Sequence, residues 1–200
     1  MIEVRWAPPH LSAEQRARAL AGLSPRERER ELTDSFLAGR LLLKALVTEL
    51  TGEAAPVIEQ SCADCGGPHG RPTVAGLWLS LSRCVVGVVA AAASVPVGID
   101  VEPAGSDAVA GMSLAEWTRT EAVLKADGRG LRVDPGEVVF TGSTATLGGT
   151  RYVVQDVTLD AGLQVSAAVR EAGPGTASAR TGRRVGPART PLQVHGSRSW

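Results

Sequence analysis

The spacing of apolar residues along the chain predicts a mixture of helices and strands. Apolar side chains recur every three or four positions from Phe36 to Leu50, which is typical of an amphipathic helix, and Gly52 ends this stripe. Segments in which apolar residues alternate with polar ones, or are β-branched, indicate strands. We expect an edge strand over residues 1–6 and further strands over residues 77–81, 85–92, 96–101, 137–140, 151–158 and 163–169.

Capping residues indicate where the helices begin. Ser12 and Ser113 are each followed three positions later by a glutamine or a glutamate, which is the spacing of a capping box. We therefore expect a short helix that ends at Ala21 and a longer one that stops at Gly128. The pair Ser24-Pro25 predicts the start of the helix that carries the apolar stripe, because proline is favoured at the first helical position. This order, a helix and then strands in each half, permits two similar α+β halves.

The charge is unevenly distributed, although the net charge is zero. Residues 172–200 contain five arginines and no acidic residue, so residues 1–171 carry a net charge of minus five (0 − 5). The arginines stand among Gly, Pro, Ser and Thr, a composition typical of a disordered basic tail. Such a tail is either simply solvated or in contact with an acidic partner.

Composition argues against several classes of protein. Residues 1–171 have no basic patch, so we expect no nucleic-acid partner. The most apolar stretch, Val85 to Val97, is shorter than the ~20 residues that a membrane-spanning helix needs. No signal peptide is indicated, because Arg5 and Pro8 precede any apolar run. The odd number of cysteines argues against a disulfide framework, so we expect a cytoplasmic protein. We also expect a monomer.

Cys62 and Cys65, with His69 nearby, allow a zinc site as one interpretation. We favour a plain loop, since a second cysteine pair is missing and Cys84 has the position of a core residue on a strand. Ser82 has the chemistry of a nucleophile, but no His or Asp stands in a recognisable sequence relation to it.

Two carboxylates lie two positions apart in a predicted strand. Alternate side chains of a strand point to the same face, so Asp100 and Glu102 share one face. Two neighbouring negative charges repel each other unless a cation lies between them. Carboxylate oxygens suit Mg²⁺, which keeps its other positions for water and phosphate. The alternative is that both are solvated acids at the end of a strand.

Glu121 is an acid on the apolar stripe of the helix that follows Ser113. It shares one face with Leu114, Trp117 and Leu124 at helical spacing. A buried acid must be paired or bind a metal. A metal ligand and a salt bridge to Lys125, four positions further on, both remain open.

Four short motifs occur in order along the chain. Residues 70–72 read Gly-Arg-Pro, residues 80–83 read Ser-Leu-Ser-Arg and residues 98–102 read Gly-Ile-Asp-Val-Glu. Residues 117–131 are similar to the pattern W-x-x-K-E-A-x-x-K-x-x-G-x-G-L. In this combination the motifs resemble the signatures of the 4′-phosphopantetheinyl transferases, of the surfactin-synthetase-activating type, and indicate a divergent member.

The resemblance implies an enzyme that moves the 4′-phosphopantetheine arm of coenzyme A onto a serine of an acyl or peptidyl carrier protein. The carriers of this family serve polyketide, nonribosomal-peptide or fatty-acid synthesis. Asp100, Glu102 and Glu121 would hold Mg²⁺ on the pyrophosphate of coenzyme A. Glu121 would also help to deprotonate the carrier serine, and Lys125 would stabilise phosphate oxygens.

The resemblance also implies contacts to coenzyme A from Arg71, Ser82 and Arg83. Arg71 would pair with the nucleotide 3′-phosphate, which suits the planar guanidinium. The implied fold is α+β, with two pseudo-symmetric halves over residues 1–94 and 95–171, each a small antiparallel sheet packed on a long helix. Coenzyme A and Mg²⁺ would lie between the halves.

The chain departs from the family pattern at several positions. Arg83 replaces a histidine that contacts phosphate, and Thr120 replaces a lysine. Ser35 stands where the family often has an arginine, with Arg40 more than one turn away. The span between residues 102 and 117 is also short. These departures favour an alternative: a degenerate or repurposed relative that binds coenzyme A or a carrier protein without transferring the arm.

Overall fold

The structure is a computed structural model with an α+β fold. It describes residues 1–62, 65–67, 70–107, 109, 111–159, 162–172 and 194–198, with Leu131 and residues 194–198 described by their backbone only. These residues form two sheets, three α-helices and three short 3₁₀ helices. No helix within the described parts of the chain has the length and apolarity that crossing a membrane requires.

The first sheet has six strands in the order β11-β1-β5-β4-β3-β2. They are β1 (Ile2–Ala7), β2 (Glu59–Gln60), β3 (Pro72–Val74), β4 (Leu77–Arg83), β5 (Val88–Ala93) and β11 (Val194–Arg198). Neighbouring strands are antiparallel, except that β11 runs parallel to β1.

The second sheet has five antiparallel strands in the order β6-β10-β9-β8-β7. They are β6 (Val97–Pro103), β7 (Val139–Thr141), β8 (Thr144–Leu147), β9 (Thr150–Asp156) and β10 (Leu163–Arg170). The chain passes from the first sheet to the second at residues 94–96, between β5 and β6.

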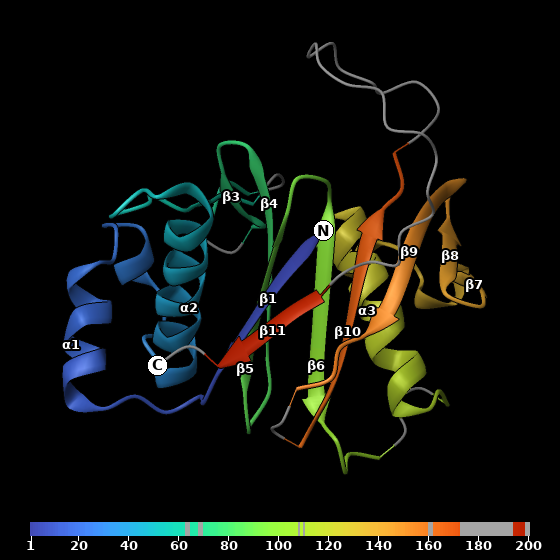
Figure 1. Cartoon of the computed structure of the whole chain (residues 1–200), viewed down its shortest axis with the longest axis horizontal. Helices are drawn as coiled ribbons and strands as arrows, with labels where there is room; N and C mark the ends of the chain where they lie inside the picture. Colours follow the sequence, from blue (N-terminus) through green and yellow to red (C-terminus); the bar gives the residue numbers. More distant parts are fainter. Residues whose placement is uncertain are drawn as a thin grey trace.

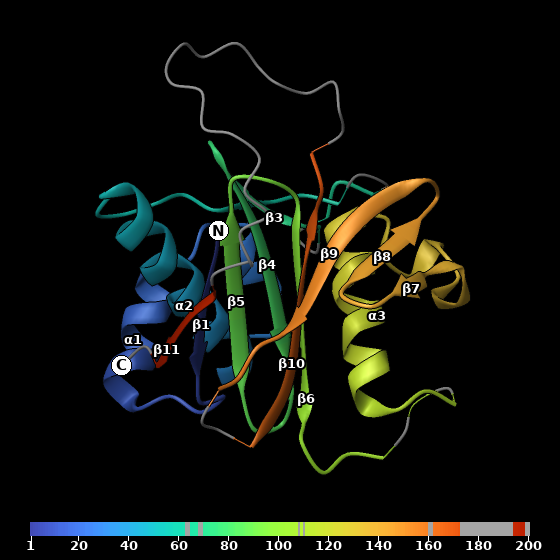
Figure 2. The same ribbon diagram turned by 45° about the vertical axis from the view of Figure 1, so that its right-hand side comes forward.

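The helices cover the two outer faces of the paired sheets. They are α1 (Ala13–Ala21), α2 (Asp34–Thr51) and α3 (Leu114–Asp127), with the 3₁₀ helices η1 (Glu27–Glu29), η2 (Gly130–Arg132) and η3 (Pro135–Glu137). Figures 1 and 2 show α1 and α2 beside the first sheet and α3 beside the second, with the strands between them. The molecule is therefore layered as helices, sheet, sheet and helix.

Each interface between layers has its own apolar core. The stripe of α2 packs on one face of β4 and β5 through residues such as Leu42 and Leu46, which have no exposed surface. α3 packs in the same way on the second sheet through residues such as Val123. The inner faces of both sheets meet in a third core that includes Val4 and Ile99. Burial of each such side chain stabilises the fold by about 1.5–3 kcal/mol.

The capping signals locate α1 and α3 correctly. Ser12 and Ser113 both form complete capping boxes, as predicted. Gly52 and Gly128 end α2 and α3 with φ of 75° and 92°, a left-handed conformation that glycine adopts without strain.

The predicted start of the second helix at Ser24-Pro25 is wrong. The Ser24 hydroxyl accepts a bond from the backbone N–H of Glu27, but only the short η1 follows, and Arg30 is extended. Thr33 caps α2 instead, since its side chain accepts from the N–H of Phe36. The chain therefore has two helix starts, one after Ser24 and one after Thr33, and only the second begins the long helix.

All seven predicted strands occur among the described residues, but β2, β3, β8 and β11 were not predicted. β8 was not predicted, because its four residues Thr144–Leu147 alternate too briefly to stand out from the flanking turns. The first strand was expected at an edge, but β1 pairs with β5 on one side and with β11 on the other. β11 also differs from the expectation of a disordered tail over residues 172–200. The other residues after 172 lie outside the described chain.

Gly98 allows α3 to lie directly on β6. A Cβ atom at this position would lie 1.9 Å from the carbonyl oxygen of Ala122 and 2.5 Å from the backbone nitrogen of Ala126. Both are backbone atoms of α3, so they cannot turn away as a side chain would. The glycine therefore fixes how closely the helix approaches the strand that carries Asp100 and Glu102.

We predict that Gly98→Ala lowers the free energy of unfolding by at least about 3 kcal/mol, because the added methyl group overpacks this contact. Gly105→Ala is the matched control, since a Cβ there meets no atom within 4 Å. Urea denaturation measures both variants. Equal stability of the two would contradict the contact between α3 and β6.

Candidate functional site: a cationic cleft beside three carboxylates

A cleft of about 360 Å³ opens where α2 and β4 of the first half face the end of α3. Five cationic side chains line it: Arg30, Arg40, Arg71, Arg83 and Lys125. The rest of the lining includes the apolar side chains of Phe36, Leu43, Leu79, Leu81 and Leu124. This combination of cations on an apolar floor suits an anionic ligand that also carries apolar groups.

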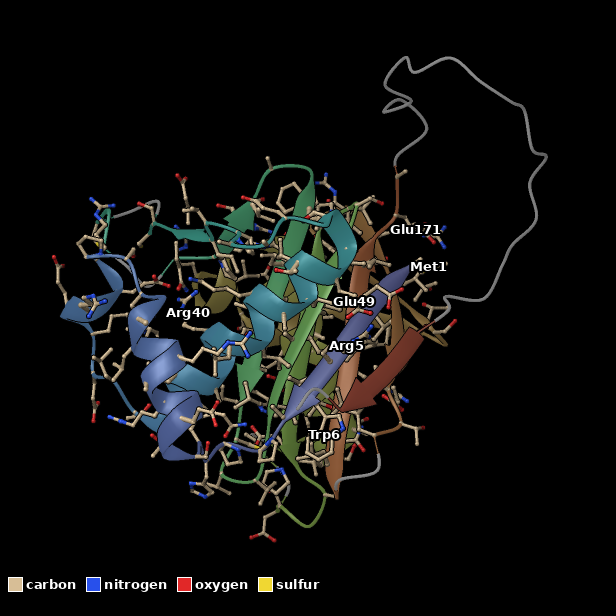
Figure 3. All side chains as sticks on the ribbon, turned by 60° about the vertical axis from the view of Figure 1, so that its left-hand side comes forward. Met1, Arg5, Trp6, Arg40, Glu49 and Glu171 are labelled. Atoms are coloured by element: carbon tan, nitrogen blue, oxygen red, sulfur yellow. The ribbon has the colours of Figure 1, made fainter. Side chains whose placement is uncertain are left out.

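Arg40 is the most deeply buried of these cations. It projects from α2 toward the side where η1 lies (Figure 3), and its side chain is 4% exposed. Its Nε lies 3.1 Å from Oε1 of Glu27, an ion pair whose angles do not make a hydrogen bond. A second nitrogen donates to Oε1 of Gln60, while Nη1 has no hydrogen-bond partner in the part of the chain that the structure describes. A buried N–H without an acceptor is unfavourable, so an anion bound beside Arg40 would supply the missing acceptor.

The guanidinium groups of Arg30, Arg40 and Arg83 repel one another. Burial lowers the pKa of Arg40, Glu27 raises it, and the charges of Arg30 and Arg83 lower it further. Burial also lowers the pKa of Arg83, and Arg30 adds to this effect. Arg30 lies over the ring of Phe36, 4.9 Å from its centre. An anion in the cleft would relieve the repulsion, because it favours the charged form of each group.

Arg71 joins the two halves. Its Nη1 donates to the carbonyl oxygen of Ala126 at 3.4 Å, and its Nη2 donates to that of Val97. The guanidinium also stacks on the ring of Trp78, 4.9 Å from the ring centre. Ala126 lies in the last turn of α3, whose carbonyl groups have no partner within the helix. Arg71 therefore lines the cleft and also binds backbone of the second half, while the nucleotide contact that the family resemblance implies stays a prediction.

Asp100 lies on the central part of β6 and is joined to the cleft through Lys125, which lines it. It is 5% exposed, and its Oδ1 accepts from the hydroxyl of Ser82 at 2.8 Å and from Nζ of Lys125 at 2.6 Å. The same ammonium donates to Ser82 at 2.9 Å. Oδ2 of Asp100 has no hydrogen-bond partner among the described residues. Ser82 thus has an aspartate beside it that its sequence neighbours did not reveal. Its hydroxyl donates to this carboxylate and accepts from Lys125.

Glu102 and Glu121 are electrostatically coupled to Asp100. Burial raises the pKa of Glu102, Asp100 raises it further, and Lys125 lowers it. Burial likewise raises the pKa of Glu121; Lys125 lowers it, and the other two carboxylates raise it. The three acids are therefore close enough to influence one another's charge. The ammonium of Lys125 bonds Asp100 instead of forming the alternative salt bridge with Glu121.

The donor set fits a divalent cation, although the carboxylates are not gathered into a ready-made site. Among the described residues, no group of three His, Cys, Asp or Glu side chains is arranged to hold a metal ion. The buried oxygen Oδ2 of Asp100 nevertheless has no hydrogen-bond partner in the described chain, and the charges around it repel one another. A divalent cation would bind Oδ2 and would reduce the repulsion between the carboxylates. Glu102 and Glu121 would have to turn toward Asp100 to complete its ligands.

The structure adds Arg30 to the residues that the sequence indicated, and it places Arg40 in the cleft although Arg40 lies more than one turn from the family's arginine position. Arg40 gave one signal, because it interrupts the apolar stripe of α2, where an unpaired charge is unfavourable. Arg30 gave none, since it lies in an irregular segment between η1 and α2. Residues 63, 64 and 69 lie outside the described chain, so the alternatives of a zinc site and a plain loop at Cys62 and Cys65 remain open.

The sequence matches no model of a known protein family, and a search of curated proteins finds no relative. The function is therefore argued from the chemistry of the cleft and of the carboxylates beside it.

We predict that Arg71→Ala lowers the free energy of unfolding by about 2–3 kcal/mol, because two charge-assisted hydrogen bonds between the halves are lost. Chemical denaturation measures the change, with the exposed Arg26→Ala as the control. If both variants are equally stable, Arg71 does not hold the halves together.

Proposed function

We propose that this protein transfers the 4′-phosphopantetheine arm of coenzyme A to a serine of an acyl or peptidyl carrier protein. The observation that carries the proposal is the position of Lys125. This side chain lines the cationic cleft and bonds Asp100, so the anion-binding region and the carboxylates form one continuous site. Transfer of a phosphoryl group needs both, since cations must hold the phosphates and a base must face the attacking hydroxyl.

The cleft suits coenzyme A as the ligand. Coenzyme A carries a pyrophosphate and a 3′-phosphate, together with an apolar adenine and a pantetheine arm. Arg30, Arg40 and Arg83 offer guanidinium groups that bind phosphate through two hydrogen bonds at once. Arg40 meets the need for an acceptor most directly, because its Nη1 is buried without one among the described residues.

The carboxylates suit Mg²⁺, with Asp100, Glu102 and Glu121 as its ligands. When bound, the metal would neutralise charge on the pyrophosphate as the phosphoryl group transfers. Glu121 is suited to accept the proton of the carrier serine, because burial raises its pKa and makes the carboxylate a stronger base, and Asp100 and Glu102 add to this effect against the opposing charge of Lys125. Lys125 is placed to stabilise phosphate oxygens once it leaves Asp100. The two sheets, each covered by a long helix, are compatible with the pseudo-symmetric fold that the family resemblance implies.

A second candidate is a protein that binds coenzyme A or a carrier protein without transfer. It is favoured by Thr120, which stands where the family has a lysine. This threonine is 2% exposed, and its hydroxyl contacts the sulfur of Met112 at 3.9 Å. The neighbouring Arg119 is engaged by Asp156, which it bonds through Nε at 2.9 Å. Neither side chain supplies the missing cation, so the site has less positive charge for the transferring phosphate.

We predict that an apo-carrier protein gains one phosphopantetheine, ~340 Da, after incubation with this protein, coenzyme A and Mg²⁺, because the metal acts as a Lewis acid in the transfer. Intact mass spectrometry measures the gain. Asp100→Asn and Glu121→Gln should abolish it while circular dichroism stays unchanged, and the exposed Glu53→Gln should retain it.

The test needs a known transferase as positive control, with several carrier proteins. No gain of mass on any carrier that the control modifies would contradict the transferase. Binding of coenzyme A in the same preparation, measured by calorimetry, would then support the second candidate.

A further inference from the structure

We propose that Lys125 is an internal cation of the carboxylates and that a divalent cation displaces it from Asp100 into the cleft. The proposal rests on the proposed function, because it assigns a switch to the same site. It explains how one lysine can bond Asp100 in the structure and still serve the phosphates of a ligand.

The contacts of Lys125 support this role. Its ammonium bonds Asp100 and Ser82, both of which are more than nine-tenths buried, yet the lysine side chain is 29% exposed and lines the cleft. The side chain of Lys125 thus already borders the cleft into which its ammonium would turn. Rotation about its side-chain bonds moves the ammonium without moving α3.

The local charge leaves room for a divalent cation. Asp100, Glu102 and Glu121 carry three negative charges when ionised, and the ammonium of Lys125 balances one of them, which leaves two (3 − 1). Asp100, which is 5% exposed, also has one oxygen, Oδ2, that accepts no hydrogen bond from any described residue. A divalent cation that binds this oxygen approaches the ammonium on the same carboxylate. The repulsion between the two cations then drives Lys125 away from Asp100.

The displaced lysine couples the metal to the anionic ligand. With the metal bound, the ammonium faces the cleft and adds its charge to those of the arginines. Binding of the metal therefore raises the affinity for a polyphosphate, and the polyphosphate must raise the affinity for the metal by the same factor.

The sequence offers a direct test, because it contains two lysines, Lys125 and Lys44. Lys44 lies on α2 and donates to the carbonyl oxygen of Gly22, so it is an internal reference. With isotope-labelled lysine, titration of the whole protein with Mg²⁺ should shift the NMR signals of the Lys125 side chain and leave those of Lys44 unchanged. Saturation with Mg²⁺ that leaves both lysines unchanged would overturn the proposal.

A matched pair of variants tests the competition itself. Lys125→Met keeps the length of the side chain and removes its charge, so the affinity for Mn²⁺ should rise at least about tenfold. Lys44→Met should leave the affinity unchanged. Calorimetry measures both, and an unchanged or weaker affinity in Lys125→Met would overturn the displacement.

These outcomes separate the two proposals. Metal binding without movement of Lys125 overturns the switch and leaves the transferase. Movement of Lys125 without any transfer to carrier proteins supports the switch and contradicts the transferase. Absence of metal binding, in both the native protein and Lys125→Met, overturns the switch and removes the metal from the proposed mechanism.

Discussion

The buried carboxylate of Asp100 is the point on which the two halves of the molecule converge. A charge at 5% exposure is unfavourable unless it is paired, and its partners come from separate parts of the chain. Ser82 reaches it from β4 of the first sheet and Lys125 from α3 on the second. The pairing of this one group therefore depends on the packing of both halves. The cationic cleft opens beside it, where the same elements meet.

Further contacts hold the two halves together around Asp100. The hydroxyl of Ser80 accepts a hydrogen bond from the backbone N–H of Ile99 at 3.0 Å. This bond links β4 of the first sheet to β6 of the second, where no backbone pairing of the described strands joins the two sheets. Gly98 brings α3 onto β6, and Arg71 binds carbonyl groups at the start of β6 and the end of α3. On the far side, Arg5 of β1 binds Glu49 of α2 at 2.6 Å and ties the outer helix to the first sheet (Figure 3). The backbone positions of the three acids are thus fixed by β6 and α3, so only side-chain rotation is needed to bring the carboxylates together.

Local chemistry made much of this predictable from the sequence. Capping boxes at Ser12 and Ser113 located two helices, and the two-residue period of a strand placed Asp100 and Glu102 on one face. What could not be predicted depends on distant contacts. The side chain of Arg40 is held in the cleft by Glu27 of η1 and Gln60 of β2. Arg71 bonds carbonyl groups that lie 26 and 55 positions further along the chain. No local pattern records such contacts.

The central claim is that the cationic cleft and the carboxylates form one site for a polyphosphate and a metal. Phosphorus NMR of coenzyme A bound to the protein, with Mn²⁺ as a paramagnetic probe, tests this most directly. The account predicts that Mn²⁺ broadens the pyrophosphate signals more strongly than the 3′-phosphate signal, and that Asp100→Asn removes the difference. Equal broadening of all phosphates, unchanged in Asp100→Asn, would show that the metal does not lie between the carboxylates and the pyrophosphate, and would contradict the account.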